Sequence, residues 1–367
     1  MELKIYKLGD LCTFINGRAY LQPELQNSGK YKIVRVGNLS GGNNSWYYSD
    51  MELEPTKYCA KGDLLYAWAC NFGPYIWKGD KTIYHYHIWK VINSEQIDKM
   101  YLYYLLKFMT NSFMGCVHGS TMLHITKENM ESMEVRIHAS IEEQRRIATI
   151  LNKLDCKIEL NRQINDNLEA QLRLITSRYI FSCPNLEKKR IGEIATVKAG
   201  GDCPITFSKT RTQKCNIPIF SNGTEDRGLY GFTNKAKIEG HSITVAARGT
   251  IGYCERRLMP FVPIIRLLAI TPKEDGAYIY LHQVIRGMKF KKNGSVQQQL
   301  TVPEISFIEI PYPHSSVLHE YNKVASPIVE MIERNISENE ILTKQRDELL
   351  PLLMNGQATV NYHLSAY

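Results

Sequence analysis

Two histidines lie close enough in the sequence to hold a metal ion together. His85 and His87 are two residues apart, in a segment, 81–91, whose apolar and aromatic residues predict a strand. Side chains two residues apart on a strand point to the same face, and imidazole is a common metal ligand. An ordinary pair of strand histidines is the more frequent reason for this spacing, so a metal-dependent hydrolytic or nuclease site around them stays an alternative.

Cysteine is the other residue type that could bind a metal or form cross-links. The nine cysteines are scattered singly, and no two have the Cys-x-x-Cys spacing of zinc sites. Their number is odd, which does not suit a disulfide framework. We therefore expect reduced, buried thiols and no metal at Cys12, Cys59, Cys70, Cys116, Cys156, Cys183, Cys203, Cys215 and Cys254.

The motifs of common catalytic sites do not occur in this sequence. It has no Gly-x-x-x-x-Gly-Lys-Ser/Thr loop for nucleotide phosphates, no Gly-x-Gly-x-x-Gly after a strand and no Gly-x-Ser-x-Gly elbow. It has no Asn-Pro-Pro-aromatic segment, which a base-amino methyltransferase would need to hold a flipped base, and no Pro-Asp…Glu-x-Lys nuclease arrangement. The sequence therefore predicts a chain that is not itself an enzyme and binds no cofactor.

The composition is that of a globular protein with a basic segment. The 367 residues are enough for two or three domains. Neither a membrane-spanning stretch of ~20 apolar residues nor a signal-peptide core is visible, so we expect a cytoplasmic protein with no membrane partner. The net charge is +8, and residues 185–315 hold 19 basic against 11 acidic side chains. Such an excess suits a polyanionic partner, although a solvated surface could also carry it.

Short motifs occur twice along the chain in the same order. The distance between the two copies falls only from about 184 to 175 residues. The matching pairs are Leu8–Leu11 with Ile191–Ile194, Gly17 with Gly200, Ile33–Asn38 with Ile217–Asn222, Gly62–Leu65 with Gly240–Ile243, and Gly119–Thr126 with Gly294–Thr301. The shared order indicates an internal duplication.

Each copy ends in a segment with the pattern of a long helix. Residues spaced alternately by four and three positions form a seam that is apolar at its ends and more polar in its middle, as in a coiled coil. Such an interrupted seam suits two helices packed antiparallel within one chain. The first seam is Ile147, Leu151, Leu154, Ile158, Asn161, Asn165, Leu168, Leu172 and Ile175, and adding 177 gives Val324, Ile328, Met331, Asn335, Glu338, Leu342, Gln345, Leu349 and Leu352.

Residues that start and stop helices mark the boundaries of the parts. Ser140 and Glu143 form a Ser-x-x-Glu capping box, and Pro184 closes the first long helix. In the second copy Pro327 predicts a kink or a restart, and Gly356 is a natural stop. The predicted parts are globular domains at 1–139 and 185–315, spacer helices at 140–184 and 316–356, and a tail at 357–367.

The two globular segments have the pattern of loop-rich mixed α/β domains, so the expected fold class is α+β or mixed α/β. Short apolar runs bounded by Gly, Asn, Pro and Asp predict strands, and longer periodic runs predict one helix in each segment. The strands are Tyr31–Val36, Asp63–Ala69, Lys81–Val91, Ser242–Ala247 and Ile264–Ile270, and the helices are Met100–Phe113 and Ala277–Lys289.

The segment Ser140–Gln163, SIEEQRRIATILNKLDCKIELNRQ, resembles the central region of the specificity subunits of type I restriction-modification systems. That family typically has Glu-Gln-x-x-Ile followed by Ile-Leu-x-x-Leu-Asp, which match Glu143–Ile147 and Ile150–Asp155 here. The second copy departs from the pattern, with Tyr321 in place of Gln144. The resemblance covers essentially the whole chain, because motifs also match at Leu8–Leu11, Ile191–Ile194, Ala247–Gly252 and Gly294–Gln297.

The resemblance implies both a fold and a role. The fold is two target recognition domains joined by two long helices packed as an antiparallel coiled coil, with an internal pseudo-twofold repeat. Each domain would read one half of a bipartite site in double-stranded DNA. The helices would dock two modification (methyltransferase) subunits and help recruit restriction (translocase and endonuclease) subunits, and these partners would supply the S-adenosylmethionine and ATP chemistry.

Charged and amide side chains in the loops are the candidates for DNA contacts. Lys and Arg bind phosphates, Arg reads guanine, and Asn or Gln reads adenine. The candidates are Arg18, Lys30, Arg35, Asn38, Asn71 and Lys78 in the first domain, and Arg211, Lys214, Asn222, Arg227, Arg248, Lys291, Gln297 and Gln298 in the second. The alternative functions are a protein-binding coiled-coil scaffold or a nuclease with an unrecognised active site.

Overall fold

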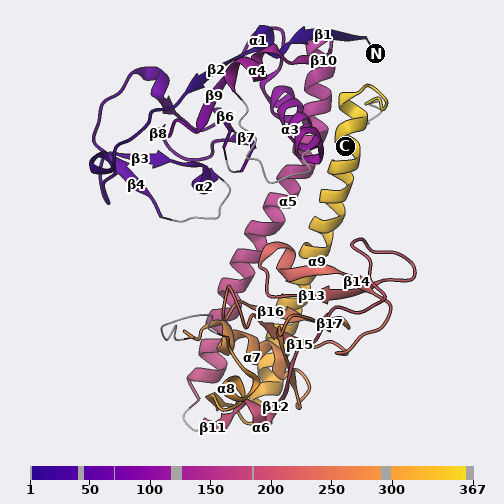
Figure 1. Cartoon of the computed structure of the whole chain (residues 1–367). Helices are drawn as coiled ribbons and strands as arrows, with labels where there is room; N and C mark the ends of the chain where they lie inside the picture. Colours follow the sequence, from indigo (N-terminus) through magenta and orange to yellow (C-terminus); the bar gives the residue numbers. More distant parts are fainter. Residues whose placement is uncertain are drawn as a thin grey trace. The chain divides into compact units, whose positions relative to one another are not determined.

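The computed structural model describes residues 2–39, 45–69, 71–116, 126–183, 186–290 and 299–360. The chain divides into two compact units (Figure 1). Unit 1 comprises Met1–Leu160 and Glu338–Tyr367, and unit 2 comprises Asn161–Ser337. Each long helix, α5 (Ile141–Thr176) and α9 (Ser315–Met354), therefore begins in one unit and ends in the other. Within these described ranges, every helix is too short or too polar to cross a membrane.

The described residues of unit 1 form three sheets. Strands β1 and β10 pair with each other, and two four-stranded sheets have the orders β2-β9-β6-β7 and β4-β3-β8-β5. Its strands are β1 (Leu3–Lys7), β2 (Cys12–Asn16), β3 (Tyr31–Val34), β4 (Tyr47–Ser49), β5 (Tyr58–Cys59), β6 (Leu64–Ala67), β7 (Gly73–Ile76), β8 (Thr82–Tyr84), β9 (Ile88–Asn93) and β10 (Glu134–His138). Its shorter helices are α1 (Leu8–Leu11), α2 (Val36–Leu39), α3 (Lys99–Cys116) and α4 (Lys127–Ser132).

Unit 2 repeats this plan. Strands β11 and β19 pair, and the larger sheets have the orders β12-β18-β15-β16 and β14-β13-β17. Its strands are β11 (Glu187–Arg190), β12 (Ala195–Ala199), β13 (Ile217–Phe220), β14 (Leu229–Thr233), β15 (Ser242–Val245), β16 (Cys254–Arg257), β17 (Val262–Pro263), β18 (Leu268–Pro272) and β19 (Glu309–Tyr312). Its shorter helices are α6 (Ile191–Ile194), α7 (Ala277–Arg286) and α8 (Val302–Ser306).

The matching strand orders confirm the internal duplication. The parallel pair β3 and β8 in unit 1 corresponds to the parallel pair β13 and β17 in unit 2. The glycines that precede the matching strands β6 and β15 also agree, because Gly62 and Gly240 both have positive φ, at 91° and 105°. A side chain disfavours that conformation, so the glycine repeat in the sequence reflects a shared turn.

Two segments predicted as single strands are each interrupted by a turn. Segment 81–91 contains β8 and β9, separated by a turn at Tyr86 and His87. In segment 264–270 only β18 is a strand, and the preceding turn holds Ile265 and Arg266 at φ values of 50° and 61°. Apolar residues continue up to both sides of each turn, so hydrophobicity alone could not separate the strands.

The two long helices pack antiparallel within each unit. In unit 2 the hydroxyls of Thr176 and Tyr321 lie 2.9 Å apart, and Asn335 Nδ2 donates to Asn165 Oδ1 at 2.8 Å. Residues that come earlier in α5 therefore contact residues that come later in α9. Unit 1 continues the same trend, because Asn339 Nδ2 donates to the carbonyl of Ile158 at 3.2 Å. This arrangement confirms the antiparallel prediction, and the asparagines form its polar middle.

The buried face of α9 lies one residue beyond the predicted seam. Val324, Met331 and Leu352 were predicted to be buried but are 38%, 46% and 40% exposed. On α5 the predicted seam is right, since Ile147, Leu151, Ile158, Asn161 and Leu172 are buried. The residues that α9 buries instead are Ala325, Val329, Ile332, Leu350 and Leu353. One residue is a rotation of about 100° on a helix, so a small drift in the repeat offset turned the predicted face partly away from the core, although Ile328 and Leu349 still pack against it.

Pro327 does not restart the second long helix, so that form of the prediction is wrong, while a kink there stays a prediction. Helix α9 runs without interruption from Ser315 to Met354. Pro327 is exposed, whereas its neighbours Ala325 and Val329 are buried in the core of unit 2. Packing of this face offsets the lost hydrogen bond of the proline. The stop at Gly356, with φ at 67°, is as expected.

Gly17 and Gly200 occupy equivalent positions where two backbone segments pass very close together. A Cβ on Gly17 would lie 2.3 Å from the carbonyl oxygen of His85, and one on Gly200 would lie 2.7 Å from the backbone nitrogen of Ile264. Both contacts involve backbone atoms, which cannot move aside easily. Their match in the sequence therefore has a structural reason: neither site has room for a side chain.

We expect Gly200→Ala to lower the free energy of unfolding by about 1–3 kcal/mol, the usual range for forcing atoms into a filled site. Urea unfolding followed by circular dichroism measures this change. Gly223→Ala is the matched control in the same unit, since its Cβ would meet nothing within 4 Å. Equal stability of the two variants would contradict the close approach.

Candidate nucleic-acid interface

Three of the cationic candidates in unit 1 are held by carboxylates. Arg18 donates to both oxygens of Glu24, at 2.7 and 3.1 Å, and this hydrogen bonding raises its pKa. Lys30 forms an exposed ion pair with Glu52. Lys78 Nζ lies 3.3 Å from a carboxylate oxygen of Glu159 on α5. These pairs are at least partly exposed, so water and salt weaken them, and a phosphate could compete for each cation.

The other candidates of unit 1 lie near the end of β3 and in the loop after β6. The guanidinium carbon of Arg35 is 4.4 Å from the ring centroid of Tyr47. Asn38 closes a local loop, since its Oδ1 accepts from the backbone nitrogen of Arg35 and its Nδ2 donates to the carbonyl of Ser45. Asn71 is exposed in the connection between β6 and β7.

The candidates of unit 2 have very different surroundings. Arg211 and Lys214 are exposed. Arg227 is enclosed by carboxylates, with Nε donating to Glu255 at 2.8 Å and two nitrogens donating to Glu333 at 2.9 and 3.0 Å. These contacts favour a positioning role for Arg227 over the base-reading role that the sequence suggested. Lys291, Gln297 and Gln298 lie outside the described residues.

The loop between β15 and β16 in unit 2 is longer than its counterpart in unit 1. Eight residues, 246–253, connect these strands, whereas five, 68–72, connect the equivalent strands β6 and β7. Gly249 and Gly252 have φ values of 67° and 87° and shape the longer loop. Arg248 stands exposed in it and donates to Gln299 Oε1, from Nε at 3.1 Å and from Nη2 at 2.6 Å. An exposed arginine beside a glutamine is a donor and acceptor set suited to base edges.

The histidine pair lies in the turn between β8 and β9. The rings of His85 and His87 have centroids 4.9 Å apart, and the ring of Tyr20 stacks near His85. Burial, followed by the neighbouring His87 and Arg35, lowers the pKa of His85 to about 4, so its ring is neutral at pH 7. In the part of the chain that the structure describes, no cluster of three or more His, Cys, Asp or Glu side chains could hold a metal ion.

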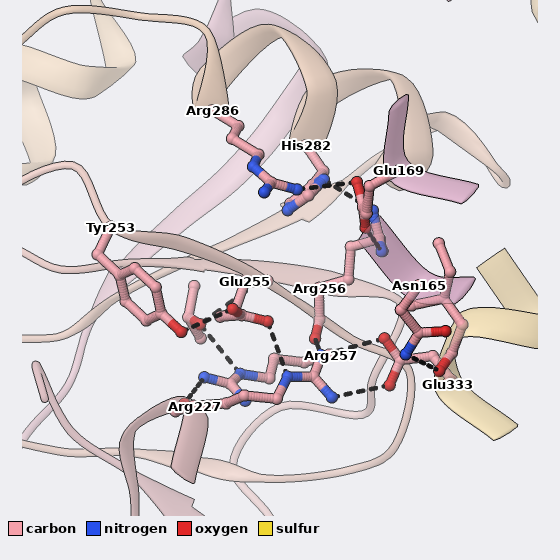
Figure 2. A network of polar contacts seen from close by, with 12 residues as sticks. Asn165, Glu169, Arg227, Tyr253, Glu255, Arg256, Arg257, His282, Arg286 and Glu333 are labelled. Carbon is pink, nitrogen blue, oxygen red and sulfur yellow. Dashed lines mark hydrogen bonds and ion pairs between the residues drawn. The ribbon is translucent and has the colours of Figure 1, made fainter. Parts of the chain in front are cut away.

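A network of ion pairs joins the globular part of unit 2 to its helices (Figure 2). Glu169 on α5 accepts from Arg256, and from Arg286 Nη1 at 2.8 Å. Arg256 is 4% exposed, and its Nη1 lies 3.0 Å from His282 Nδ1. Burial and then the adjacent Arg256 hold the pKa of His282 well below its usual range, which keeps the ring neutral and able to accept this hydrogen bond.

The same network fixes the end of β16 and its neighbours. Glu255 accepts from Arg227 and, at 2.7 Å, from the hydroxyl of Tyr253. Arg257 donates to Thr244 Oγ1 at 3.0 Å and to the carbonyl of Arg227 at 2.5 Å. Burial favours the neutral form of Glu255, yet the nearby Arg227 outweighs it and lowers its pKa. Unit 2 therefore contains a set of mutually paired, charged side chains beneath its loops.

The family model described as the type I restriction modification DNA specificity domain matches residues 1–170 and again residues 185–350. The chain belongs to this family. The two matches place one specificity domain with the first copy of the repeat and one with the second. The resemblance of the central segment and the duplication thus lead to the same family.

Proteins with similar sequences carry the names of type I specificity subunits. A putative type I specificity subunit of Mycoplasma pneumoniae is 31% identical over 186 residues, which span 48% of this chain and 56% of that protein. A second one from the same organism is 24% identical over 345 residues, which span 89% of this chain and 90% of that protein. The crystal structure of the S subunit from M. genitalium has a TM-score of 0.60 at 18% identity and covers 96% of each chain, so it shares the fold.

The residues that sequence reasoning missed in unit 2 are the paired ones. Glu169, Arg256, His282 and Arg286 come from three separate elements, α5, β16 and α7. Nothing in their local spacing suggested that they meet. The excess of basic side chains in residues 185–315 was the one available signal, and we interpreted it as an attraction for a polyanion. Part of that excess charge is instead neutralised within unit 2 by Glu169 and Glu333.

Proposed function

We propose that this chain selects a bipartite site in double-stranded DNA, with each specificity domain reading one half. The observation that carries the proposal is the pair of domains with the same strand order but different loops. Base-edge contacts require loops of particular shape and chemistry, whereas phosphate contacts only need cations. Two copies of one fold with different loops between β6 and β7 and between β15 and β16 would therefore read two different half-sites.

The chain would act within a larger type I restriction-modification complex and would not catalyse a reaction itself. Two modification subunits would dock on its helices and carry out methyl transfer, and restriction subunits would add translocation and cleavage. The absence of catalytic motifs from the sequence supports this division of labour. Turnover of DNA by the purified chain alone would contradict it, and loss of that turnover in a His85→Ala, His87→Ala variant would point to a nuclease.

Mapping methylated bases in DNA from cells that contain this chain and its partners tests the proposal. We expect two short half-sites separated by a fixed gap. Absent or sequence-independent DNA binding by the full complex would favour a protein-binding scaffold instead.

Exchanging residues 1–139 for those of another member of the family should change one half-site and leave the other half-site as it was. The reason is that the loops of unit 1 and of unit 2 belong to separate compact bodies. Methylation mapping of the hybrid measures both half-sites at once. The matched control exchanges residues 185–315 and should change the opposite half-site; a change in both half-sites by either exchange would contradict independent reading.

A further inference from the structure

Backbone strain among the described residues occurs in a few short segments of unit 2. Among the described residues, the non-glycine residues with positive φ are Asp226, Arg227, His241, Ile265 and Arg266. Four of these five lie in two short segments, 226–227 and 265–266. Conformations of this kind persist only where the surroundings enforce them, and they often mark functional positions. Asn222, which lies in the same loop as 226–227, bonds to the second segment, because its Nδ2 donates to the carbonyl of Ile265 at 2.6 Å.

Asn222 also holds the loop that carries Arg248. Its Oδ1 accepts from the backbone nitrogen of Ala247 at 2.8 Å, and its carbonyl accepts from Thr250 Oγ1 at 3.1 Å. The carbonyl of Ala247 in turn accepts from the backbone nitrogen of Leu300 at 2.9 Å. Because Arg248 follows Ala247 and Gln299 precedes Leu300, these bonds bring the two exposed side chains together. Both ends of the Asn222 amide are thus occupied by backbone groups.

The loop that contains Asn222 is itself fastened to helix α9. The backbone nitrogen of Ser221 donates to the carbonyl of Gly228 at 2.8 Å, which closes the loop on itself. Within it, Arg227 has φ at 57° and donates through two nitrogens to Glu333 on α9. A continuous series of bonds therefore runs from α9 through Arg227 and Asn222 to Arg248.

We propose that Asn222 is a positioning residue that sets the Arg248 loop for base reading, and that the Arg227–Glu333 pair holds the loop of Asn222 in place. This inference rests on the proposed function. It replaces the direct DNA contact that the sequence suggested for Asn222 with an indirect role, because the nitrogen and the oxygen of its amide are each bonded to a backbone group of the protein. In unit 1 the matching Asn38 bonds to Arg35 and Ser45, so the two specificity domains would support their loops differently.

The test uses the complex of the full chain with its modification subunits and a DNA duplex that carries the mapped site. Affinity is measured for this duplex and for duplexes with single-base changes in each half-site, at one fixed salt concentration. The variants are Arg248→Ala, Asn222→Ala and the double variant. Asn234→Ala is the matched control, since this exposed asparagine of unit 2 has one weak side-chain contact, at 3.5 Å to Thr233.

We expect Arg248→Ala and Asn222→Ala each to weaken discrimination at the same base positions by about 5-fold to 150-fold, the effect of losing one base-reading contact. The double variant should be no worse than Arg248→Ala, and the other half-site should be read as before. A general loss of folding would weaken both half-sites, so this pattern separates positioning from stability. Glu333→Gln should act in the same direction with a smaller effect.

Three results would overturn the inference. If Arg248→Ala weakens discrimination between bases and Asn222→Ala discriminates as well as the wild type, the Arg248 loop does not need Asn222. Additive losses in the double variant would show that Asn222 acts independently. Wild-type behaviour of Arg248→Ala would remove the loop from base reading altogether, whereas the proposed function itself fails only if the complex shows no base preference at either half-site.

Discussion

Replacing Glu169 with alanine should lower the free energy of unfolding of unit 2 by about 3–5 kcal/mol, the range for removing one partner of a buried ion pair. Arg256 is 4% exposed and would keep its charge without a carboxylate. Its remaining contact with His282 cannot compensate, because that ring is neutral. Arg286 would also lose its partner, but its side chain is 46% exposed and water would replace the interaction.

The tryptophans allow the effect to be assigned to one unit. All four, Trp46, Trp68, Trp77 and Trp89, lie in unit 1. In Glu169→Ala, urea unfolding followed by circular dichroism should acquire an early transition, whereas tryptophan fluorescence should change at nearly the wild-type concentration. The control is Glu320→Ala, which removes an exposed pair with Lys323. A shift as small as that of the control would contradict the anchoring role of Glu169.

Replacing Asp155 with alanine should destabilise unit 1 by about 2–4 kcal/mol, slightly less than for Glu169 because water reaches the site. Asp155 on α5 accepts from Arg346 at 2.7 Å and from the hydroxyl of Tyr104 at 2.9 Å, and Lys107 Nζ lies 3.6 Å away. Its side chain is 24% exposed. Its loss would leave two cations beside each other. Here tryptophan fluorescence should report the early transition, the reverse of the pattern for Glu169.

The stability of unit 1 should also fall in acid through Asp155. Burial alone would raise its pKa, but Lys107 and the hydrogen bonds from Arg346 and Tyr104 outweigh burial and hold the pKa below its usual range. A carboxylate with a depressed folded-state pKa stabilises fully above its unfolded pKa of about 4. That contribution is lost as the pH falls through the folded pKa. Asp155→Asn should flatten this part of the stability profile, and an unchanged acid slope would contradict the assignment.

Sequence reasoning predicted the architecture well because that architecture depends on repeated, local patterns. The duplication, the antiparallel helices and Gly17 with Gly200 all follow from spacing or from backbone conformation. The seam on α9 was displaced by one residue because Val324 and Ala325 are both apolar, and only the neighbouring core selects which one is buried. The turn at Ile265 was missed for a similar reason: it is an apolar residue in a left-handed conformation.

The candidate site was only partly predictable. Arg248 was singled out from its glycine-flanked loop, and the structure places it beside Gln299. Arg227 and Asn222 have the residue types of DNA contacts, but their partners come from segments distant in the sequence. A residue type states which bonds are possible, and the fold decides which of these are already made within the protein.

The antiparallel pairing of the long helices also has a consequence for synthesis on the ribosome. The core of unit 1 contains Leu350, Leu353 and Met354 from the end of α9, whereas unit 2 is one continuous stretch, Asn161–Ser337. Domains usually complete their folding in the order in which they are made. In this chain the order is inverted. All residues of unit 2 are synthesised before unit 1 is complete, and part of the core of unit 1 stays uncovered until the last turns of α9 leave the ribosome.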